Sequence, residues 1–143
     1  PSLGVDRAFL VFMFDAYEYD KKRENIVLKL HPKLAPTKIA VFPLLKNKKS
    51  LVKKARDVYS LLKEDFASMY DESGSIGKRY ARQDEAGTFL GVTVDFDSLK
   101  KNDCTIRSRD TTKQIRVKIK DLNNVVEELI GGEKLSKFGK YIN

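Results

Sequence analysis

The chain has 143 residues, of which 41% are hydrophobic and 34% are charged, so it fits one globular domain or one domain plus a fragment. Its longest apolar run, Ala8 to Phe14, is far too short to cross a membrane and lacks a signal-peptide cleavage site. The net charge of +8 favours a polyanionic partner, although lysines that serve only solubility explain part of it. The single cysteine, Cys104, excludes an internal disulfide and agrees with the cytoplasm as the expected location.

The N-terminal segment predicts a helix over residues 5–17 and, after a polar turn, a short strand over residues 26–30. The helix is apolar around its whole circumference, a pattern that requires burial on several sides. In a free domain such a helix lacks partners, so this segment is expected to come from something larger. Pro32 and Pro36 then interrupt the chain, and a domain boundary is placed between them near residue 35.

Strands and helices alternate after this boundary. Strands are predicted at 38–44, 68–72, 88–96, 104–109 and 113–120, and helices at 50–66, 74–87 and 122–130. Helical crossovers are right-handed, which makes the early strands parallel. The fold class is therefore α/β, and the polar tail over residues 134–143 is expected to be loosely held.

The last two predicted strands, 104–109 and 113–120, alternate apolar and polar residues. They predict a hairpin with one solvent-facing, cationic side that carries Arg107, Arg109 and Arg116. Arginine suits bidentate contacts with phosphates or base edges, whereas lysine would serve for solubility alone. This choice of residue favours a role in nucleic-acid binding for these positions.

The segment from Gly74 to Gly87 places three cations and two carboxylates on one short helix. Its Gly-Lys pair is similar to a nucleotide-binding Walker loop, but Glu72 stands where a glycine is required and Arg79 replaces the hydroxyl residue. Nucleotide hydrolysis by this loop is therefore excluded. The Gly74-x-x-Gly77 spacing matches a nucleic-acid clamp, but a tight strand-to-helix turn explains it at least as well.

The charges of this helix leave two alternatives open. Lys78, Arg79 and Arg82 lie three or four residues apart, which places them side by side. If Glu85 pairs with Arg82, the charges form a surface lattice worth little energy. If they are unpaired, Arg79 and Arg82 contact phosphates, while Asp84 or Glu85 accepts a hydrogen bond from a cytosine amino group.

The sequence shows no catalytic constellation. His31 stands alone before Pro32, where a surface or structural role is expected, and it has no partner for a nucleophilic triad. No Cys/His cluster predicts a metal site. Asp95 and Asp97 flank a predicted strand end, where they are expected to be solvated.

Several long, ordered stretches resemble the C-terminal part of class II glycyl-tRNA synthetases of the archaeal and eukaryotic type. These stretches are Leu34–Leu44, Gly74–Gly87, Gly91–Asp97, Arg107–Asp110 and Gln114–Arg116. The resemblance implies an anticodon-binding domain over residues 35–143, with a five-stranded mixed β-sheet flanked by three helices. It implies that anticodon bases are held near the sheet and its helix ends. The candidate anticodon-binding residues are Arg79, Tyr80, Arg82, Asp84, Glu85, Arg107, Arg109 and Arg116.

The N-terminus carries a second match, because Pro1–Arg7 resembles the end of class II motif 3. The resemblance implies that Arg7 contacts an ATP phosphate and that Pro1 and Ser2 help to bind glycine. Motifs 1 and 2 are missing, so residues 1–34 are expected to be the C-terminal remnant of a catalytic domain. The fragment alone is predicted to be inactive and to need no cofactor, whereas ATP and Mg serve the full enzyme.

The function implied by this resemblance is anticodon recognition by a glycine–tRNA ligase. The chain would bind tRNA(Gly) so that the catalytic domain can charge it with glycine. The implied partners are the anticodon stem-loop and the catalytic domain of the same enzyme, within a full-length homodimer and away from membranes. The alternative is a protein-interaction or accessory-subunit module of the same fold, whose arginines pair with acidic residues of a partner.

Overall fold

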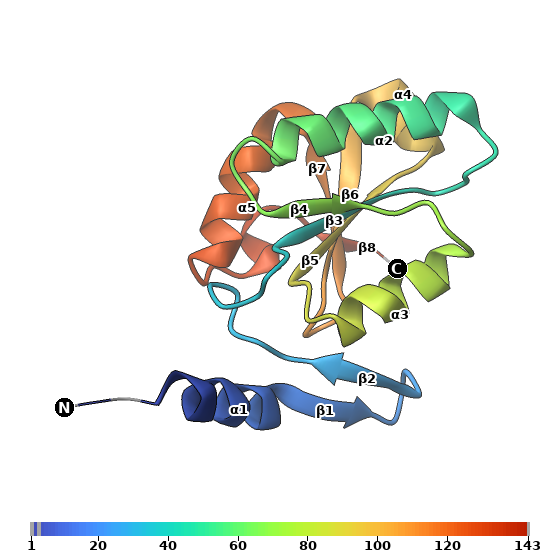
Figure 1. Cartoon of the computed structure of the whole chain (residues 1–143). Coiled ribbons are helices and arrows are strands. Elements are labelled where there is room, and N and C mark those ends of the chain that lie inside the picture. Colours follow the sequence, from blue (N-terminus) through green and yellow to red (C-terminus); the bar gives the residue numbers. More distant parts are fainter. Residues whose placement is uncertain (1, 3, 143) are drawn as a thin grey trace.

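The computed structural model describes residues 2 and 4–142, and it begins with a helix and a hairpin. α1 (Val5–Ala16) leads directly into β1 (Tyr17–Asp20), which pairs antiparallel with β2 (Asn25–Leu28). In Figure 1 these blue elements extend below the rest of the molecule. The helix predicted over residues 5–17 and the strand predicted over residues 26–30 are confirmed as α1 and β2. β1 escapes prediction because its Tyr-Glu-Tyr-Asp alternation covers only four residues and the helix predicted over residues 5–17 includes Tyr17.

Most of α1 has no cover in the described part of the chain. Val5 and Phe14 are 78% and 75% exposed, and only Ala16 of this helix is buried. Ala16 packs with Leu30 and Ala35 in a small cluster of its own. The expected shortage of partners is therefore observed. No described helix is both long enough and apolar enough to span a membrane.

The remaining elements follow a linker. They are β3 (Ile39–Pro43), α2 (Lys49–Leu62), β4 (Ser68–Tyr70), α3 (Ile76–Glu85), β5 (Leu90–Val94), α4 (Phe96–Lys101), β6 (Asp103–Ser108), β7 (Gln114–Lys118), the 3-10 turn η1 (Ile119–Asp121), α5 (Leu122–Ile130), the 3-10 turn η2 (Leu135–Lys137) and β8 (Tyr141–Ile142).

The strands form one mixed sheet in the order β4-β3-β5-β6-β7-β8. β3 pairs parallel with β4 and β5, and the remaining neighbours are antiparallel. The α/β class and the mixed sheet are thus confirmed. The sheet contains the five predicted strands and a sixth, β8, which has two residues.

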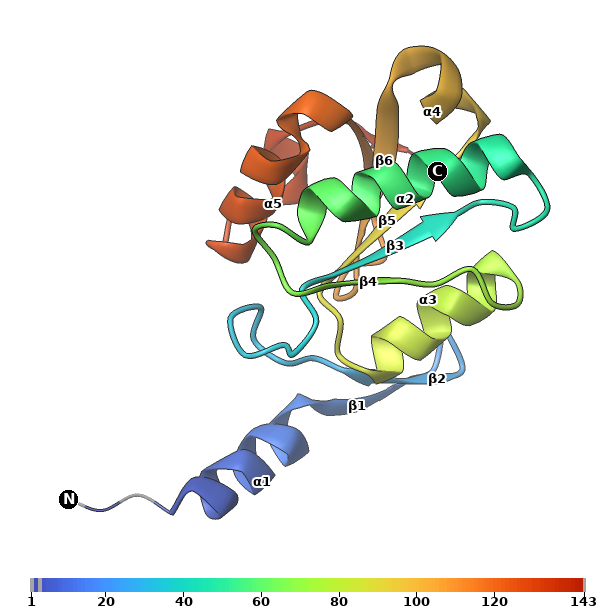
Figure 2. The same cartoon turned by 45° about the horizontal axis from the view of Figure 1, so that its top comes forward.

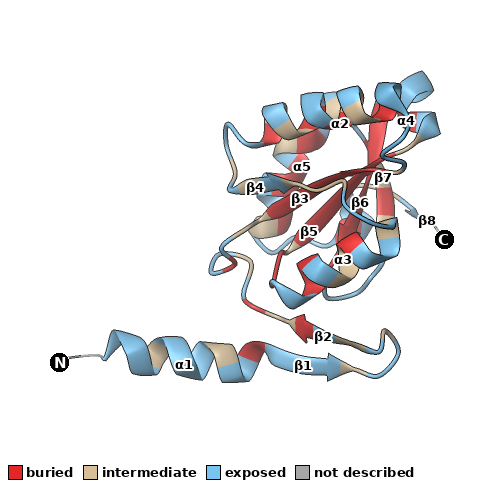
Figure 3. Ribbon diagram, turned by 45° about the vertical axis from the view of Figure 1, so that its right-hand side comes forward, coloured by how far each residue is buried: buried red, intermediate tan, exposed pale blue. Residues whose placement is uncertain are grey.

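The two faces of the sheet are covered differently. Figures 1 and 2 show α2 and α5 on one side of the sheet and α3 on the other. α2 and α5 contribute apolar side chains to the main core, together with β3, β5, β6 and β7. The buried residues of α3 are instead Arg79, Gln83 and Asp84. In Figure 3 the central strands are almost entirely buried between these layers.

Two predicted boundaries are wrong. α2 ends at Leu62 rather than near residue 66. The strand predicted over residues 88–96 stops at Val94, and Asp95 then begins α4. The Asp95 carboxylate accepts hydrogen bonds from the backbone N–H and the hydroxyl of Ser98, each at 2.9 Å. Asp95 is therefore a helix cap and not merely a solvated loop residue.

Residues 134–142 of the C-terminal tail pack against the domain, so the looseness predicted for this part of the tail is wrong. Leu135 is buried in the main core, and β8 pairs with β7 through Tyr141 opposite Ile115. The unpaired edge of β7 provides backbone groups for β8, a contact that the polar composition of the tail does not reveal.

Candidate nucleic-acid interface

The sheet face under α3 carries polar side chains where the opposite face is apolar. Thr93 of β5 and Thr105 and Arg107 of β6 lie on this polar face. All six residues of β6 are buried, so the predicted solvent-facing side of this strand is wrong. Long side chains from α3 and β7 cover it, an arrangement that strand periodicity alone cannot distinguish from exposure.

Tyr80 of α3 packs closely against β5 because Gly91 leaves room for its ring. A Cβ atom at Gly91 would lie only 2.6 Å from the Tyr80 ring. The Tyr80 hydroxyl is 2.6 Å from Thr93 Oγ1, and the Arg107 guanidinium carbon lies 4.6 Å from the ring centroid. Burial raises the pKa of Tyr80, so the phenol stays protonated and the ring supports Arg107 through a cation–π contact.

Asp84 of α3 is the centre of an ion-pair network. Arg107 binds it in a fork, with Nη1 to Oδ1 and Nη2 to Oδ2 both at 3.0 Å. Arg23, from the turn between β1 and β2, donates from Nη1 to Asp84 Oδ2, also at 3.0 Å. Only 4% of the Asp84 side chain is exposed. Asp84 therefore holds two arginines, and neither of them is Arg79 or Arg82.

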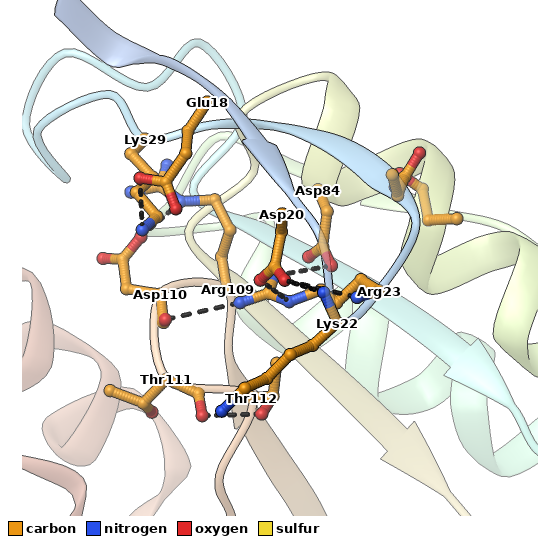
Figure 4. A network of polar contacts seen from close by, with 12 residues as sticks. Glu18, Asp20, Lys22, Arg23, Lys29, Asp84, Arg109, Asp110, Thr111 and Thr112 are labelled. Carbon is orange, nitrogen blue, oxygen red and sulfur yellow. Dashed lines mark hydrogen bonds and ion pairs between the residues drawn. The ribbon is translucent and has the colours of Figure 1, made fainter.

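Arg23 connects this network to the hairpin and to the β6–β7 turn. Its Nε lies 2.8 Å from Asp20 Oδ2, and its Nη2 donates to the Asp110 carbonyl at 3.3 Å (Figure 4). Burial raises the pKa of Asp20, but hydrogen bonds from the backbone N–H groups of Lys22 and Arg23 lower it by more. Sequence reasoning missed Arg23, because in the run Lys21-Lys22-Arg23 it looks like one more solvated cation.

Two predicted site residues have guanidinium groups turned to main-chain carbonyls. Arg109 is 2% exposed and donates to the carbonyls of Gly87 at 2.8 Å and Leu30 at 2.7 Å. Arg79 is 1% exposed and donates to the carbonyls of Pro43 and, at 2.8 Å, Gly74. Both side chains hold loops in place and lie away from solvent.

Arg82 and Glu85 lie on the exposed side of α3. Arg82 Nη2 contacts Asp71 Oδ2 at 2.6 Å and the Ser73 carbonyl at 2.7 Å, while 44% of its side chain stays exposed. Burial raises the pKa of Asp71, but the hydrogen bonds from Arg82 and from the backbone of Ser73, together with the charges of Arg82 and Arg79, lower it by more. The pairing of Arg82 with Glu85 is wrong, and Glu85 makes no ion pair with another described residue.

Arg116 of β7 lies at the far end of the polar face. It forms ion pairs with Asp95 and, at 2.7 Å, with Asp103. The hydrogen bonds that Arg116 donates to Asp95 and Asp103 raise its pKa further above its ordinary value. Burial raises the pKa of Asp95, but the hydrogen bonds from Arg116 and Ser98 and the charge of Arg116 together lower it by more. About a quarter of the Arg116 side chain remains exposed, at 24%.

An open groove lies where α3, the turn end of the β1–β2 hairpin and β6 meet. Its volume is about 280 Å³. It is lined by Arg23, Asn25, Gly77, Tyr80, Ala81, Asp84 and Arg107. A Cβ atom at Gly77 would meet no atom within 4 Å, so the missing side chain helps to keep the groove open. Asn25 forms its other wall and donates to the Ala81 carbonyl at 3.1 Å.

The structure thus brings together three of the predicted site residues, Tyr80, Asp84 and Arg107, and adds Arg23 and Asn25. Ser2 and Arg7 are exposed near the start of the chain, and Pro1 lies outside the described residues. The Nδ1 atom of His31 accepts a hydrogen bond from the backbone of its neighbour Lys33 at 3.2 Å.

Neither a metal site nor a reactive thiol is found in the described part of the chain. No group of three His, Cys, Asp or Glu side chains is placed to hold a metal ion among residues 2 and 4–142. Cys104 is buried in the core, and this burial raises its pKa to about 12. The thiol therefore stays protonated and inert at neutral pH.

Comparison with protein families identifies a known domain. The family described as "Anticodon binding domain" matches residues 38–129, which is more than half of the chain. This range runs from the start of β3 almost to the end of α5, so it includes the sheet, α3 and the polar face.

The chain is also similar to glycine–tRNA ligases of bacteria. It is 51% identical over 133 residues to that of Clostridium acetobutylicum, with 91% of this chain and 28% of that protein covered. For Clostridium kluyveri the identity is 47% over 133 residues, with 91% and 28% covered. For Caldanaerobacter subterraneus subsp. tengcongensis it is 50% over 130 residues, with 90% and 28% covered.

These relatives are much longer than the chain, which spans about 28% of their length. Identity near 50% across nine-tenths of the chain establishes homology to glycine–tRNA ligases, which are aminoacyl-tRNA synthetases. The chain therefore belongs to the anticodon binding domain family, and within that family it is similar to the domain of glycine–tRNA ligases.

Proposed function

We propose that this chain holds the anticodon end of tRNA(Gly) for a glycine–tRNA ligase. The observation that carries the proposal is the groove beside α3, which opens on the polar sheet face of an anticodon binding domain. The identity of the tRNA in this proposal comes from the similarity to glycine–tRNA ligases. The groove is the proposed binding site for one base of its anticodon.

The size and the lining of the groove suit a single unstacked base. Its volume of about 280 Å³ lies just below the roughly 300–1,000 Å³ of typical small-molecule sites. Proteins read single-stranded RNA loops by accepting splayed bases and hydrogen-bonding to their edges. Arg107 is oriented for this role before RNA binds, since Asp84 holds its fork and Tyr80 supports its plane.

The other candidate residues have supporting roles in this proposal. Arg82 and Glu85, on the exposed side of α3, face the backbone or the edges of neighbouring nucleotides. Arg116 serves the far end of the polar face, where part of its side chain is exposed. Arg79 and Arg109 hold the loops around the groove and act as positioning residues.

Filling the groove tests this proposal without damaging the fold. Because a side chain at position 77 meets open space, Gly77→Leu should occupy the groove and also favour the helix. We expect the variant to bind a tRNA(Gly) anticodon hairpin about tenfold or more weakly, within the ~1–3 kcal/mol of a lost base contact. Fluorescence anisotropy measures the affinity, and thermal unfolding should show unchanged or higher stability.

Two controls make the test specific. Gly77→Ala gives most of the helix stabilisation but little of the volume, so it should bind RNA nearly as the wild type does. Hairpins in which the two anticodon cytosines are replaced in turn should bind more weakly than the cognate hairpin. Unchanged affinity of Gly77→Leu would contradict the groove, and equal binding of all hairpins would contradict anticodon reading.

The proposal also divides the chain. Residues 1–34 would belong to the end of a catalytic domain and residues 35–143 to the anticodon-binding domain. The exposed apolar side of α1 supports this division, because such a surface is usually covered by another part of a protein. The family match begins shortly after the boundary.

The complete enzyme is part of the same proposal. Arg7 would contact a phosphate of ATP, which is used with Mg, and Pro1 and Ser2 would help to bind glycine. The enzyme would act in the cytoplasm as a homodimer.

A further inference from the structure

The positive charge of this chain is concentrated in one short segment. Residues 45–56 contain Lys46, Lys48, Lys49, Lys53, Lys54 and Arg56 and no acidic residue. The rest of the chain carries 22 cationic and 20 acidic side chains, a net charge of only +2. Most of the net charge of +8 thus comes from the loop before α2 and the first half of that helix. We call these six side chains the basic patch.

Most of the basic patch is exposed and unpaired. Lys46, Lys48, Lys49 and Lys53 are exposed, and none has a carboxylate within 4.0 Å in the described part of the chain. Arg56 is also exposed, and its one ion pair, with Glu72, is long at 3.6 Å. Such a pair contributes little, so nearly all of this charge is available to a partner.

The basic patch also surrounds the N-terminus of α2, where positive charges destabilise a helix. The N-terminus of α2 carries a partial positive charge, which acidic residues usually balance. Here the first turn has no acidic residue, Lys48 occupies the cap position, and no side chain caps the helix. Along this side of α2 the surface is hollowed, with a volume of about 400 Å³. Four cations and one carboxylate line the hollow together with Val52: Lys46, Lys49, Lys53, Arg56 and Asp57. An anion bound there would satisfy both the lysines and the helix end.

The basic patch and α3 lie on opposite faces of the sheet but come near each other at one edge. Figures 1 and 2 show the N-terminal ends of α2 and α3 at the same edge of the sheet. Arg56 pairs with Glu72, and the preceding residue, Asp71, pairs with Arg82 of α3. One polyanion could therefore contact both surfaces around this edge.

We propose that the basic patch binds the phosphate backbone of the RNA stem next to the anticodon loop. This inference rests on the proposed function, which places that loop in the groove. Phosphate contacts position a nucleic acid without reading its sequence, and lysines suit them because they act as point charges with flexible stems. The patch thus adds affinity, whereas the groove adds base discrimination.

The test replaces three lysines, Lys48, Lys49 and Lys53, with glutamine, which has a similar helix propensity. Each lost phosphate contact lowers the slope of log affinity against log salt by about 0.7–0.9, so the slope should become shallower by about 2–3. The probe is the tRNA(Gly) anticodon hairpin, and base discrimination should remain as in the wild type. A loop oligonucleotide without a stem should bind both proteins alike.

The matched control replaces Lys63, Lys134 and Lys140 with glutamine, which removes the same charge from exposed positions elsewhere. It should change the slope by less than about 0.5, well below one full phosphate contact. An equal effect of both triple variants would overturn the proposal, since overall charge would then explain the binding. So would an unchanged slope combined with patch-dependent binding of a poly-aspartate peptide, which would indicate an acidic protein partner.

Failure of this proposal and failure of the proposed function look different. If the wild type does not bind the hairpin, or binds it without base discrimination, the function in anticodon reading fails. If the wild type binds and discriminates but the lysine variant keeps its salt slope, only the role of the basic patch fails.

Discussion

The two faces of the central sheet use the same strands but are stabilised in opposite ways. Toward α2 and α5, alternate residues of β3, β5, β6 and β7 are aliphatic and form one apolar core. Toward α3, the alternate residues include threonines and arginines, and their polar groups are matched by hydrogen bonds and ion pairs. Apolar packing tolerates many arrangements, whereas each buried charge needs a particular partner.

The comparison explains where function can be located in this domain. The apolar face is closed by its helices and supplies stability. The polar face holds its charges in fixed positions and leaves a groove beside α3. Preformed, directional groups of this kind can discriminate between ligands, because a ligand that fails to match them leaves them unpaired.

Of the changes considered for the two faces, removal of the Asp84 carboxylate from the polar face should reduce the free energy of unfolding the most. Asp84→Ala leaves Arg107 and Arg23 without their shared carboxylate in a mostly buried site. We expect a loss of about 3–5 kcal/mol in the free energy of unfolding, measured by urea denaturation. The exposed neighbour is the control, since Glu85→Ala should change stability by less than about 0.5 kcal/mol. A loss below about 1 kcal/mol for Asp84→Ala would mean that water replaces the carboxylate easily.

Two glycines of the polar face should respond in opposite directions. Gly91→Ala places a Cβ 2.6 Å from the Tyr80 ring, so the ring must move, at a cost of about 1–3 kcal/mol. Gly77→Ala meets no atom and should stabilise α3 by about 0.5–1 kcal/mol. Thermal unfolding compares both variants with the wild type. If both substitutions had the same sign, the contact between Tyr80 and the strand would not control the packing of this face.

The smallest expected effect is on pH dependence. Burial raises the pKa of Asp95, but hydrogen bonds from Arg116 and Ser98 and the charge of Arg116 together lower it by more, so the pKa in the folded protein is lowered. A lowered folded pKa means that the ion pair stabilises the protein above the unfolded value of about 3.9 and is lost as the pH falls below it. Asp95→Asn should therefore flatten the decline of unfolding free energy below about pH 4. Asp97→Asn, at an exposed pair 3.6 Å long, should leave the decline unchanged.

Much of the fold could be predicted because its signals are local. The apolar run of β3 and the apolar stripe of α5 indicate a buried strand and a packed helix without knowledge of their neighbours. The errors lie where a local pattern is weak or ambiguous. β1 alternates over only four residues directly after a helix, and β8, with two residues, is too short to show a pattern. β6 alternates as a half-exposed strand does, although α3 covers its polar side.

The candidate site could be predicted as a region but not as a set of contacts. Tyr80, Asp84 and Arg107 were expected in the site and do line the groove. Arg79 and Arg109 carry the same chemical group as Arg107, yet they are turned to main-chain carbonyls. The contacts that each arginine makes in the folded protein distinguish Arg79 and Arg109 from Arg107. The sequence cannot show these contacts, because an arginine reads the same whether it is buried or solvated.

The amino-acid sequence by itself determined the order of the longer elements, the α/β class and the family, because periodicity and long ordered matches are properties of the chain. Only the tertiary structure decided which charges meet. Asp84 binds Arg107, 23 residues later, and Arg23, 61 residues earlier. Ion pairs depend on distances of a few ångströms in space, and these distances are created when the hairpin, α3 and β6 come together.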